Sequence, residues 1–430
     1  MDKLTGTIRL VLILFLFSTL FHLDTAFCAG SIRKLETASS PNPVGSGARA
    51  LGMGGAFIAI ADDATAASWN PGGLTQLDTP EISFALGYQQ RSESFSLAVL
   101  SESTFDNSVD TYHLNYLSVA YPFEFLNRNM IVSLNYQRLY DFNRNWIFEV
   151  DGGAGLIHNV NYEADGALYA VGLAYSTMIT LDLSVGVTLN YWGDFIRENQ
   201  WTQTLNEIIS NPFIGTLTNT LDEEFDFEGW NANLGFLWSI SSHWTLGGVF
   251  KLPFSARVDR RAIYSNILGI VRKSTKDRLD MPMAYGLGLA WRISDALTVS
   301  ADVYRTHWQD FIYRPENDIS TSPVSGKPAS ESDIEATTWF RLGAEYLYIG
   351  EKFVVPIRGG IFYDPAPAEG SPDEYYGFCL GSGIAYKRYI WDISYQFRYG
   401  DDVGGSMLSD LGFSQDVREH TIVTSLIIHF

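Results

Sequence analysis

From residue 81 onward, apolar and polar positions alternate with a period of two over long stretches of the chain. Between 181 and 191 the odd positions are Leu, Leu, Val, Val, Leu and Tyr, whereas the even ones are Asp, Ser, Gly, Thr and Asn. Such alternation is typical of β-strands with two unlike faces. The pattern predicts about fourteen strands, near 81–91, 111–123, 129–141, 167–177, 181–193, 229–240, 244–257, 278–293, 296–309, 336–349, 353–363, 375–388, 389–400 and 417–430.

A soluble sandwich and an outer-membrane barrel both show this alternation, so other features have to separate them. Segments 281–292 and 389–399 reach the 9–11 residues that a tilted strand needs to cross a bilayer. Aromatic residues lie near segment ends, short connections (241–243, 294–295) alternate with long ones (194–228, 310–335), and the last strand ends on Phe430. We therefore expect an all-β protein whose residues 81–430 form a transmembrane antiparallel β-barrel.

The first 29 residues have the composition of a secretory signal peptide. Lys3 and Arg9 flank an apolar run from 10 to 21, and small residues follow at Ala26 and Ala29. The run is shorter than the roughly 20 residues of a spanning helix, and no later stretch reaches that length. We expect cleavage after export and a location in the outer membrane of a Gram-negative bacterium, in contact with its lipid and as a monomer.

Composition and motifs argue against several classes of protein. The formal charge of −20 is unsuited to nucleic acid. Cys28 lies in the signal segment, which leaves Cys379 without a disulfide partner. The seven histidines are scattered, the glycine runs lack dinucleotide-binding spacing, and the segment around Ser382 lacks the glycine of a nucleophile elbow. We expect no catalytic residues, metal or cofactor, and hence no enzyme.

Residues 30–80 are rich in small side chains and predict a different structure. A fourteen-strand barrel is too wide for side chains alone to fill, so an unplugged barrel would leak. A compact, partly helical plug in the lumen would prevent this, and Asn70-Pro71-Gly72 has the composition of a tight turn within it. We expect Asp62 and Asp63 to act as caps or salt-bridge partners in the plug rather than as metal ligands.

The segment ADDATAASWNPGGL, residues 61–74, resembles the hatch signature of the FadL/TodX (OMPP1) outer-membrane transporters. The likeness continues through FKLPF at 250–254 and the strands of 281–311 and 341–368. It assigns the hatch motif to Asn70 and Pro71, with Gly72 where the family usually has alanine. It implies passive uptake of long-chain fatty acids or hydrocarbons. In the family a kinked third strand opens the wall sideways, whereas 129–141 contains neither glycine nor proline.

Two predicted external loops are unexpectedly apolar. Exposed apolar surface costs about 25 cal/mol per Å², so these loops should either hold a hydrophobic substrate in a groove or bury one another. Their apolar residues, at roughly helical spacing in the first loop, are Leu205, Ile208, Ile209, Phe213, Ile214 and Leu217 in 194–228, and Ile263, Ile267, Leu268, Ile270 and Val271 in 258–277.

Three arginines on predicted lumen-facing positions are further candidates. Arg341, Arg358 and Arg398 could bind the carboxylate head group of a substrate. The alternative is that they brace the barrel interior through ion pairs with Asp392 and Glu345.

Two other functions remain open at this stage. Residues 44–74 also resemble the N-terminal segment of PorV-type barrels, which bind proteins as components of a secretion system. A general porin is a third possibility, and it would conduct ions freely whereas a plugged barrel would not. The later segments and the two apolar loops favour uptake of a hydrophobic small molecule.

Overall fold

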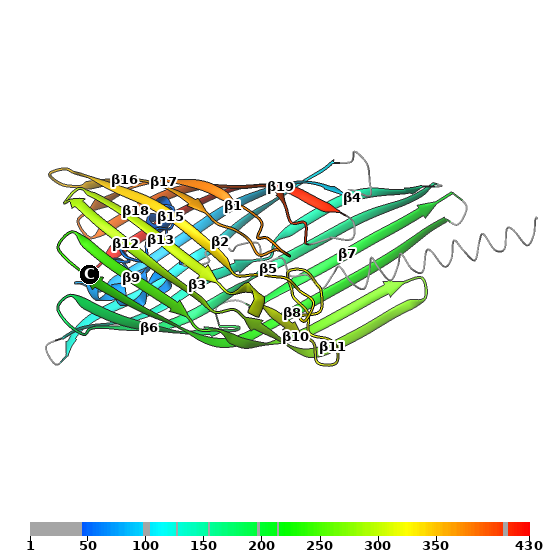
Figure 1. The fold of residues 1–430 in the computed structure, drawn as a ribbon, viewed down its shortest axis with the longest axis horizontal. Coiled ribbons are helices and arrows are strands. Elements are labelled where there is room, and N and C mark those ends of the chain that lie inside the picture. Colours follow the sequence, from blue (N-terminus) through cyan, green and yellow to red (C-terminus); the bar gives the residue numbers. More distant parts are fainter. Residues whose placement is uncertain are drawn as a thin grey trace, which may run out of the picture.

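A computed structural model describes residues 45–97, 104–125, 128–153, 155–195, 198–212, 215–406 and 412–430. Fourteen antiparallel strands form a closed barrel in which each strand pairs with the next and β19 pairs with β1 (Figure 1). The predicted number of fourteen barrel strands is confirmed, and each predicted range overlaps one of these strands. They are β1 (Glu81–Leu97), β2 (Thr104–Phe125), β3 (Arg128–Asp141), β5 (Leu156–Met178), β6 (Leu183–Trp192), β8 (Gly215–Ser239), β9 (Trp244–Lys251), β12 (Ala284–Ser294), β13 (Leu297–Thr306), β15 (Thr337–Ile349), β16 (Val354–Tyr363), β17 (Tyr376–Tyr386), β18 (Tyr389–Val403) and β19 (Phe413–His429).

The apolar face of the strands points outward, as expected for a wall in contact with acyl chains. Leu173, Leu287 and Leu380 face outward and are 56–59% exposed. Trp244 and Trp291 stack at 5.3 Å near the end of the barrel that carries the short turns, as in an interfacial aromatic girdle. Short turns mark the periplasmic end of such barrels, so the opposite end faces the exterior.

The external end carries a sheet that the sequence analysis did not predict. The strands β4 (Arg144–Gly153), β7 (Gln200–Asn211), β10 (Phe254–Asn266), β11 (Gly269–Met281) and β14 (Ile312–Arg314) pair with one another and with the outer halves of β5 and β8. We name this sheet the extension. It continues the barrel wall away from the membrane (Figure 1).

Two predictions are corrected by the extension. The helical spacing in 194–228 is wrong, because β7 and the outer half of β8 fill that segment, and 258–277 forms most of the β10–β11 hairpin. The predicted strands 244–257 and 278–293 each cross a break at Leu252-Pro253 or Pro282-Met283. Proline lacks the N–H that a ladder requires, so the chain leaves the strand at these positions.

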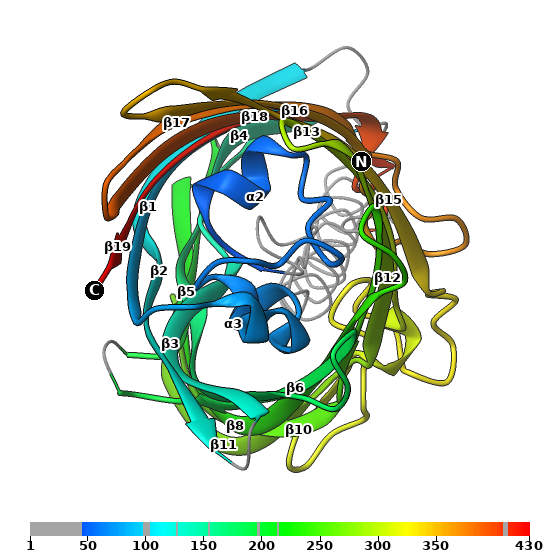
Figure 2. The same ribbon diagram turned by 90° about the vertical axis from the view of Figure 1, so that its left-hand side faces the viewer.

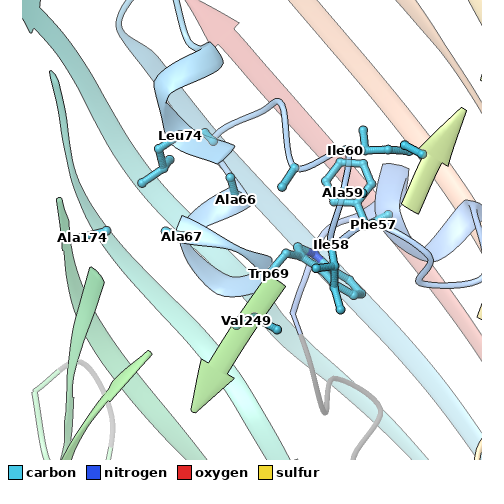
Figure 3. Close-up of a cluster of buried hydrophobic side chains, with 14 of the residues drawn as sticks. Phe57, Ile58, Ala59, Ile60, Ala66, Ala67, Trp69, Leu74, Ala174 and Val249 are labelled. Atoms are coloured by element: carbon cyan, nitrogen blue, oxygen red, sulfur yellow. The ribbon is translucent and has the colours of Figure 1, made fainter. Parts of the chain in front are cut away.

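The described N-terminal residues lie inside the barrel, where they form the short helices α2 (Ala48–Gly52), α3 (Ala66–Trp69) and η1 (Pro71–Gln76) (Figure 2). We call residues 45–80 the hatch. Phe57 and Trp69 meet edge to face at 5.9 Å, and they pack in one cluster with Ala174 and Val249 of the wall (Figure 3). The expected signal peptide, residues 1–29, lies outside the described residues. Within the described part of the chain, no helix is long and apolar enough to cross a membrane.

The hatch touches the wall through glycines. A Cβ atom added to Gly186 of β6 would collide with the Pro71 carbonyl, and one added to Gly235 of β8 would collide with the Asn70 side chain. Gly343 on β15 meets the Met53 backbone in the same way. The hatch backbone therefore lies directly against the inner surface of the wall, with no side chain of these residues in between.

We expect Gly186→Val to displace the hatch and to raise the ion conductance of the barrel in planar lipid bilayers. The added side chain has no room beside Pro71, and overpacking of this kind typically costs about 1–3 kcal/mol. Gly359→Val is the matched control, because the nearest atom to its Cβ would be 3.9 Å away. Equal conductance of the two variants would contradict the contact.

Candidate functional site

The outer part of the lumen is lined by buried aromatic and aliphatic side chains. Trp201 of β7 and Phe225 of β8 stack at 4.7 Å, and Trp192 of β6 packs against Phe227 and Phe254. We name the whole set the aromatic cluster. Its buried members are Leu139, Phe142, Leu168, Ala170, Trp192, Trp201, Phe225, Phe227, Ala256, Val258, Leu279, Met281, Trp308, Phe311, Tyr313, Val324 and Ile334.

A second apolar group, the outer cluster, lies further from the membrane along the same strands. It comprises Phe95, Leu97, Trp146, Phe148, Val160, Leu205 and Phe413. Strand β5 connects both clusters to the buried residues around Phe57 and Trp69 in the hatch. Val160 belongs to the outer cluster, Leu168 to the aromatic cluster and Ala174 to the group around Phe57 and Trp69. One side of the lumen is thus apolar from the extension to the hatch, whereas a water-filled porin channel is polar.

A small cavity with a mostly apolar lining and a few polar side chains lies at the inner edge of the aromatic cluster. Its volume is about 50 Å³, and Lys251 lines it together with Asn190, Asn231 and Asn233. Trp192, Phe254 and Tyr304 form the adjoining apolar surface. Ligand pockets usually hold about 300–1,000 Å³, so a larger solute enters only if nearby side chains or the hatch move.

Sequence reasoning missed Lys251, which places an amine among apolar lumenal side chains. A usable signal was present, because Lys251 interrupts the apolar segment Phe250-Lys251-Leu252-Pro253-Phe254. Its strand partners Asn233 and Ala284 are buried on the lumenal face, so the lysine shares that face.

The candidate residues of the first loop divide between the two faces of the extension. Leu205 and Ile209 of β7 are buried, and Leu205 belongs to the outer cluster. Ile208 lies on the other face and is 42% exposed, while Leu217 of β8 is half-buried and pairs in register with Ile209. Phe213 and Ile214 lie outside the described residues.

The candidate residues of the second loop lie at and near the end of the β10–β11 hairpin, where all of them are exposed. They are Ile263, Ile267, Leu268, Ile270 and Val271, with exposed fractions from 38% to 84%. This high exposure means that the two loops do not bury one another. The two sets lie on neighbouring hairpins of one sheet rather than across a common groove.

Two of the three candidate arginines lie close to the hatch. The Arg341 guanidinium donates to the Gly54 carbonyl of the hatch at 3.0 Å. Arg358 lies between Glu345 and Asp392, with both N–O distances at 2.6 Å.

Arg398 is likewise engaged with acidic groups. It pairs with Glu419 at 2.9 Å and Asp364 at 3.2 Å, while its guanidinium covers the Tyr375 ring. All three arginines are buried, so these contacts fit the bracing alternative.

The hatch motif bonds the plug to the wall. The Asn70 amide donates to the carbonyls of Ile58 and Phe236, both at 2.8 Å, and its oxygen accepts from the Gly72 N–H at 3.1 Å. Ser184 of β6 donates to the Gly72 carbonyl at 2.7 Å. Pro71, which is buried, begins the 3-10 helix η1, where a missing N–H costs nothing. Asn70 thus joins two parts of the hatch to β8.

Acidic side chains bond other parts of the hatch. Asp302 of β13 accepts from the N–H groups of Phe57 and Ile58 at 2.8 and 2.9 Å. Within the hatch, Arg49 pairs with Asp62 at 2.5 Å, so the salt-bridge role expected of Asp62 is present. Asp63 accepts from the Thr65 N–H at 2.8 Å in a local turn, and helix α3, whose N-cap is Thr65, has no side-chain cap hydrogen bond. Among the described residues, no group of histidine, cysteine and acidic side chains could hold a metal ion.

Asp302→Ala should loosen residues 56–60 of the hatch. The substitution leaves two buried N–H groups without their acceptor, and each unsatisfied group costs about 1–3 kcal/mol of stability. Hydrogen exchange of the Phe57 and Ile58 amides should accelerate in this variant. In Asp302→Asn, which retains one acceptor oxygen, the exchange rates of these amides should stay closer to those of the wild type. Unchanged exchange in the alanine variant would contradict the proposed anchor.

The wall has an interruption between β2 and β3. Their ladder runs from Phe125 and Arg128 to Tyr116 and Gln137, and in the described part of both strands no pair follows, although β2 continues to Thr104 beside β1. All five residues from Asn135 to Leu139 are buried, so β3 no longer alternates between lipid and lumen there. Register shifts lie at this level in both the β1–β2 and the β3–β5 ladders.

External loops are fastened over the barrel end by a group of polar contacts. Glu369 accepts from Lys327 and Ser332 at 2.8 Å each, and Asp373 accepts from the Gly404 N–H at 2.7 Å. Burial raises the pKa of the Asp373 carboxyl to about 6, although the Gly404 N–H acts to lower it.

The Asp373 pKa predicts a pH dependence of the loop contact. An exposed aspartate titrates near pH 3.9, so closure of the loop gains stability by binding a proton as the pH falls through about 6. This contribution is full below about pH 3.9 and is lost as the pH rises through about 6. Hydrogen-exchange protection of Gly404 should therefore increase from pH 7 to pH 5, and Asp373→Asn should remove the dependence. If the protection of Gly404 still depends on pH in this variant, a group other than Asp373 causes the dependence.

Comparison with known proteins places these features in context. The family model described as "Outer membrane protein transport protein (OMPP1/FadL/TodX)" matches residues 38–374. No curated protein matches the chain.

Several solved structures are similar in fold. A Pseudomonas aeruginosa FadL homologue has 13% identity and a TM-score of 0.68, over 90% of this chain and 98% of its own. The P. putida toluene transporter TodX has 14% identity and a TM-score of 0.58, over 90% and 99% of the two chains. The Ralstonia pickettii toluene transporter TbuX has 14% identity and a TM-score of 0.55, over the same shares.

Proposed function

Because the chain belongs to the OMPP1/FadL/TodX family of outer-membrane transport proteins, we propose that it takes up long-chain fatty acids or hydrocarbons passively. The observation that carries this proposal is the apolar lining along one side of the lumen, from the extension to the hatch. A solute gains about 0.8 kcal/mol for each methylene that it buries there. A barrel that conducts hydrophilic solutes has a polar, water-filled lumen instead.

The route begins at the extension. The exposed hairpin residues Ile267 and Leu268 make the first contact with an apolar solute, and the inward-facing Leu205 and Ile209 then receive it. From the outer cluster the solute passes the aromatic cluster to the cavity beside Lys251. Movement of the hatch or its neighbouring side chains makes room at this point.

The interruption between β2 and β3 serves as the lateral exit. Transport through the plugged barrel to the periplasm would carry an apolar solute into water, whereas a gap in the wall leads directly to acyl chains. In the described residues the two strands separate beyond Tyr116 and Gln137, just outside the level at which Tyr116 binds the Ala64 carbonyl of the hatch.

Mass spectrometry of small molecules retained by the detergent-purified protein tests the proposal. We expect a fatty acid or hydrocarbon to be retained, and Lys251→Met decides between these two. Removal of a charge-assisted hydrogen bond should lower retention of a fatty acid roughly tenfold and leave that of a neutral hydrocarbon unchanged. Lys276→Met, on an exposed position of β11, is the matched control.

Other outcomes favour the alternative functions. Stable co-purification of a soluble protein, with no retained small molecule, supports a PorV-like role in secretion. Large ion conductance of the wild-type protein supports a general porin.

A further inference from the structure

The membrane-facing wall carries a large apolar groove on the side formed by β5, β6, β8, β9 and β12. Its volume is about 800 Å³, and none of its fourteen lining residues is charged. Tyr175 and Leu287 lie at opposite edges, and Val187 and Leu234 lie between them. The ladders of these strands are continuous, so the groove is a depression in an intact wall and is separate from the β2–β3 interruption.

Glycine produces the depression. A Cβ atom on Gly248 would collide with the Phe236 ring, so the ring occupies the space that a side chain at 248 would otherwise fill. The Phe236 ring therefore lies along the wall instead of projecting from it. Neighbouring lipid-facing positions carry residues larger than glycine, such as Trp238 and Leu289, which project from the wall and are 45% and 40% exposed.

The position of the groove along the strands indicates at which edge of the membrane it begins. Phe236 is three residues before the end of β8 at Ser239, and Gly248 is four residues after the start of β9 at Trp244. At about 3.3 Å per residue and a tilt of about 40°, these positions lie roughly 8–10 Å from the short turns. The lining residues extend from Val185, two residues after the start of β6 at Leu183, to Tyr285, nine residues before the end of β12 at Ser294. The apolar band of such barrels is about 25 Å tall, so the groove begins near its periplasmic edge, beside the stacked Trp244 and Trp291, and runs past its middle.

We propose that this groove binds one acyl chain of a phospholipid in the periplasmic leaflet. Five adjacent strands span about 19 Å at about 4.8 Å per spacing, which accommodates an extended acyl chain. Within a bilayer, burial from water adds nothing to binding, so affinity comes from close packing of the chain against the concave surface. A flat wall offers fewer such contacts, and the groove chain should therefore exchange more slowly than its neighbours.

The test uses the full-length protein in vesicles of phosphatidylethanolamine and phosphatidylglycerol. A trace of phosphatidylethanolamine carries a photoreactive acyl chain, and crosslinked residues are mapped by mass spectrometry. We expect labelling around Val187 and Leu234 to exceed labelling around Leu342 and Ile361, on the lipid-facing surface of β15 and β16, by at least about fivefold.

Val187→Trp fills the groove and should reduce its labelling to the level of the reference surface. Leu342→Trp places the same side chain on the reference surface and should leave groove labelling unchanged. If Val187→Trp does not form a barrel, as judged by heat-modifiable migration in gels, Leu287→Trp fills the groove from its other edge.

Two results would overturn the proposal. Equal labelling around the barrel would show ordinary contact with bulk lipid. Displacement of the groove label by an added fatty acid or hydrocarbon, with phospholipid in excess, would make the groove a site for transported solute. The inference does not rest on the proposed uptake function, because uptake through the lumen should be unaffected by Val187→Trp.

Discussion

The structure depends on one constraint, which is that the hatch has no strand partner and yet lies in a closed lumen. The backbone N–H and C=O groups that its own short helices and turns leave unbonded therefore have to be bonded by side chains, many of them from the wall. Asp302 accepts from two hatch N–H groups, while Tyr116 and Thr188 donate to the carbonyls of Ala64 and Ala67 at 2.8 and 2.9 Å. These polar side chains on the inner face explain why alternation persists in strands whose outer face meets lipid.

The strands within the membrane could be predicted from the sequence because their two environments differ so sharply. Lipid on one side and a polar hatch contact on the other impose a strict period of two, as in β6. The extension has apolar residues on both faces, for example Ile208 outside and Ile209 inside. Its pattern consequently looked helical, since short apolar runs are ambiguous between the two structures.

The candidate site was predictable only in part. The turn at Asn70-Pro71 was recognisable from its residues, because proline and glycine have defined backbone roles. The β2–β3 interruption could not be predicted from the sequence, because the register shifts that accompany it require neither glycine nor proline in β3. The roles of Lys251 and of the wall glycines could not be predicted either, because they depend on contacts with residues far away in sequence. Lys251 lies beside Asn233, and Gly186 lies against Pro71.

The hatch touches opposite sides of the barrel. Helix α2 packs on β17, β18 and β19, next to the pairing of the first and last strands, whereas η1 packs on β5, β6 and β8 across the lumen. The hatch consequently connects opposite sides of the wall and stabilises the cross-section of the barrel. A change in the cross-section of the barrel therefore strains the same contacts that hold the hatch in the lumen.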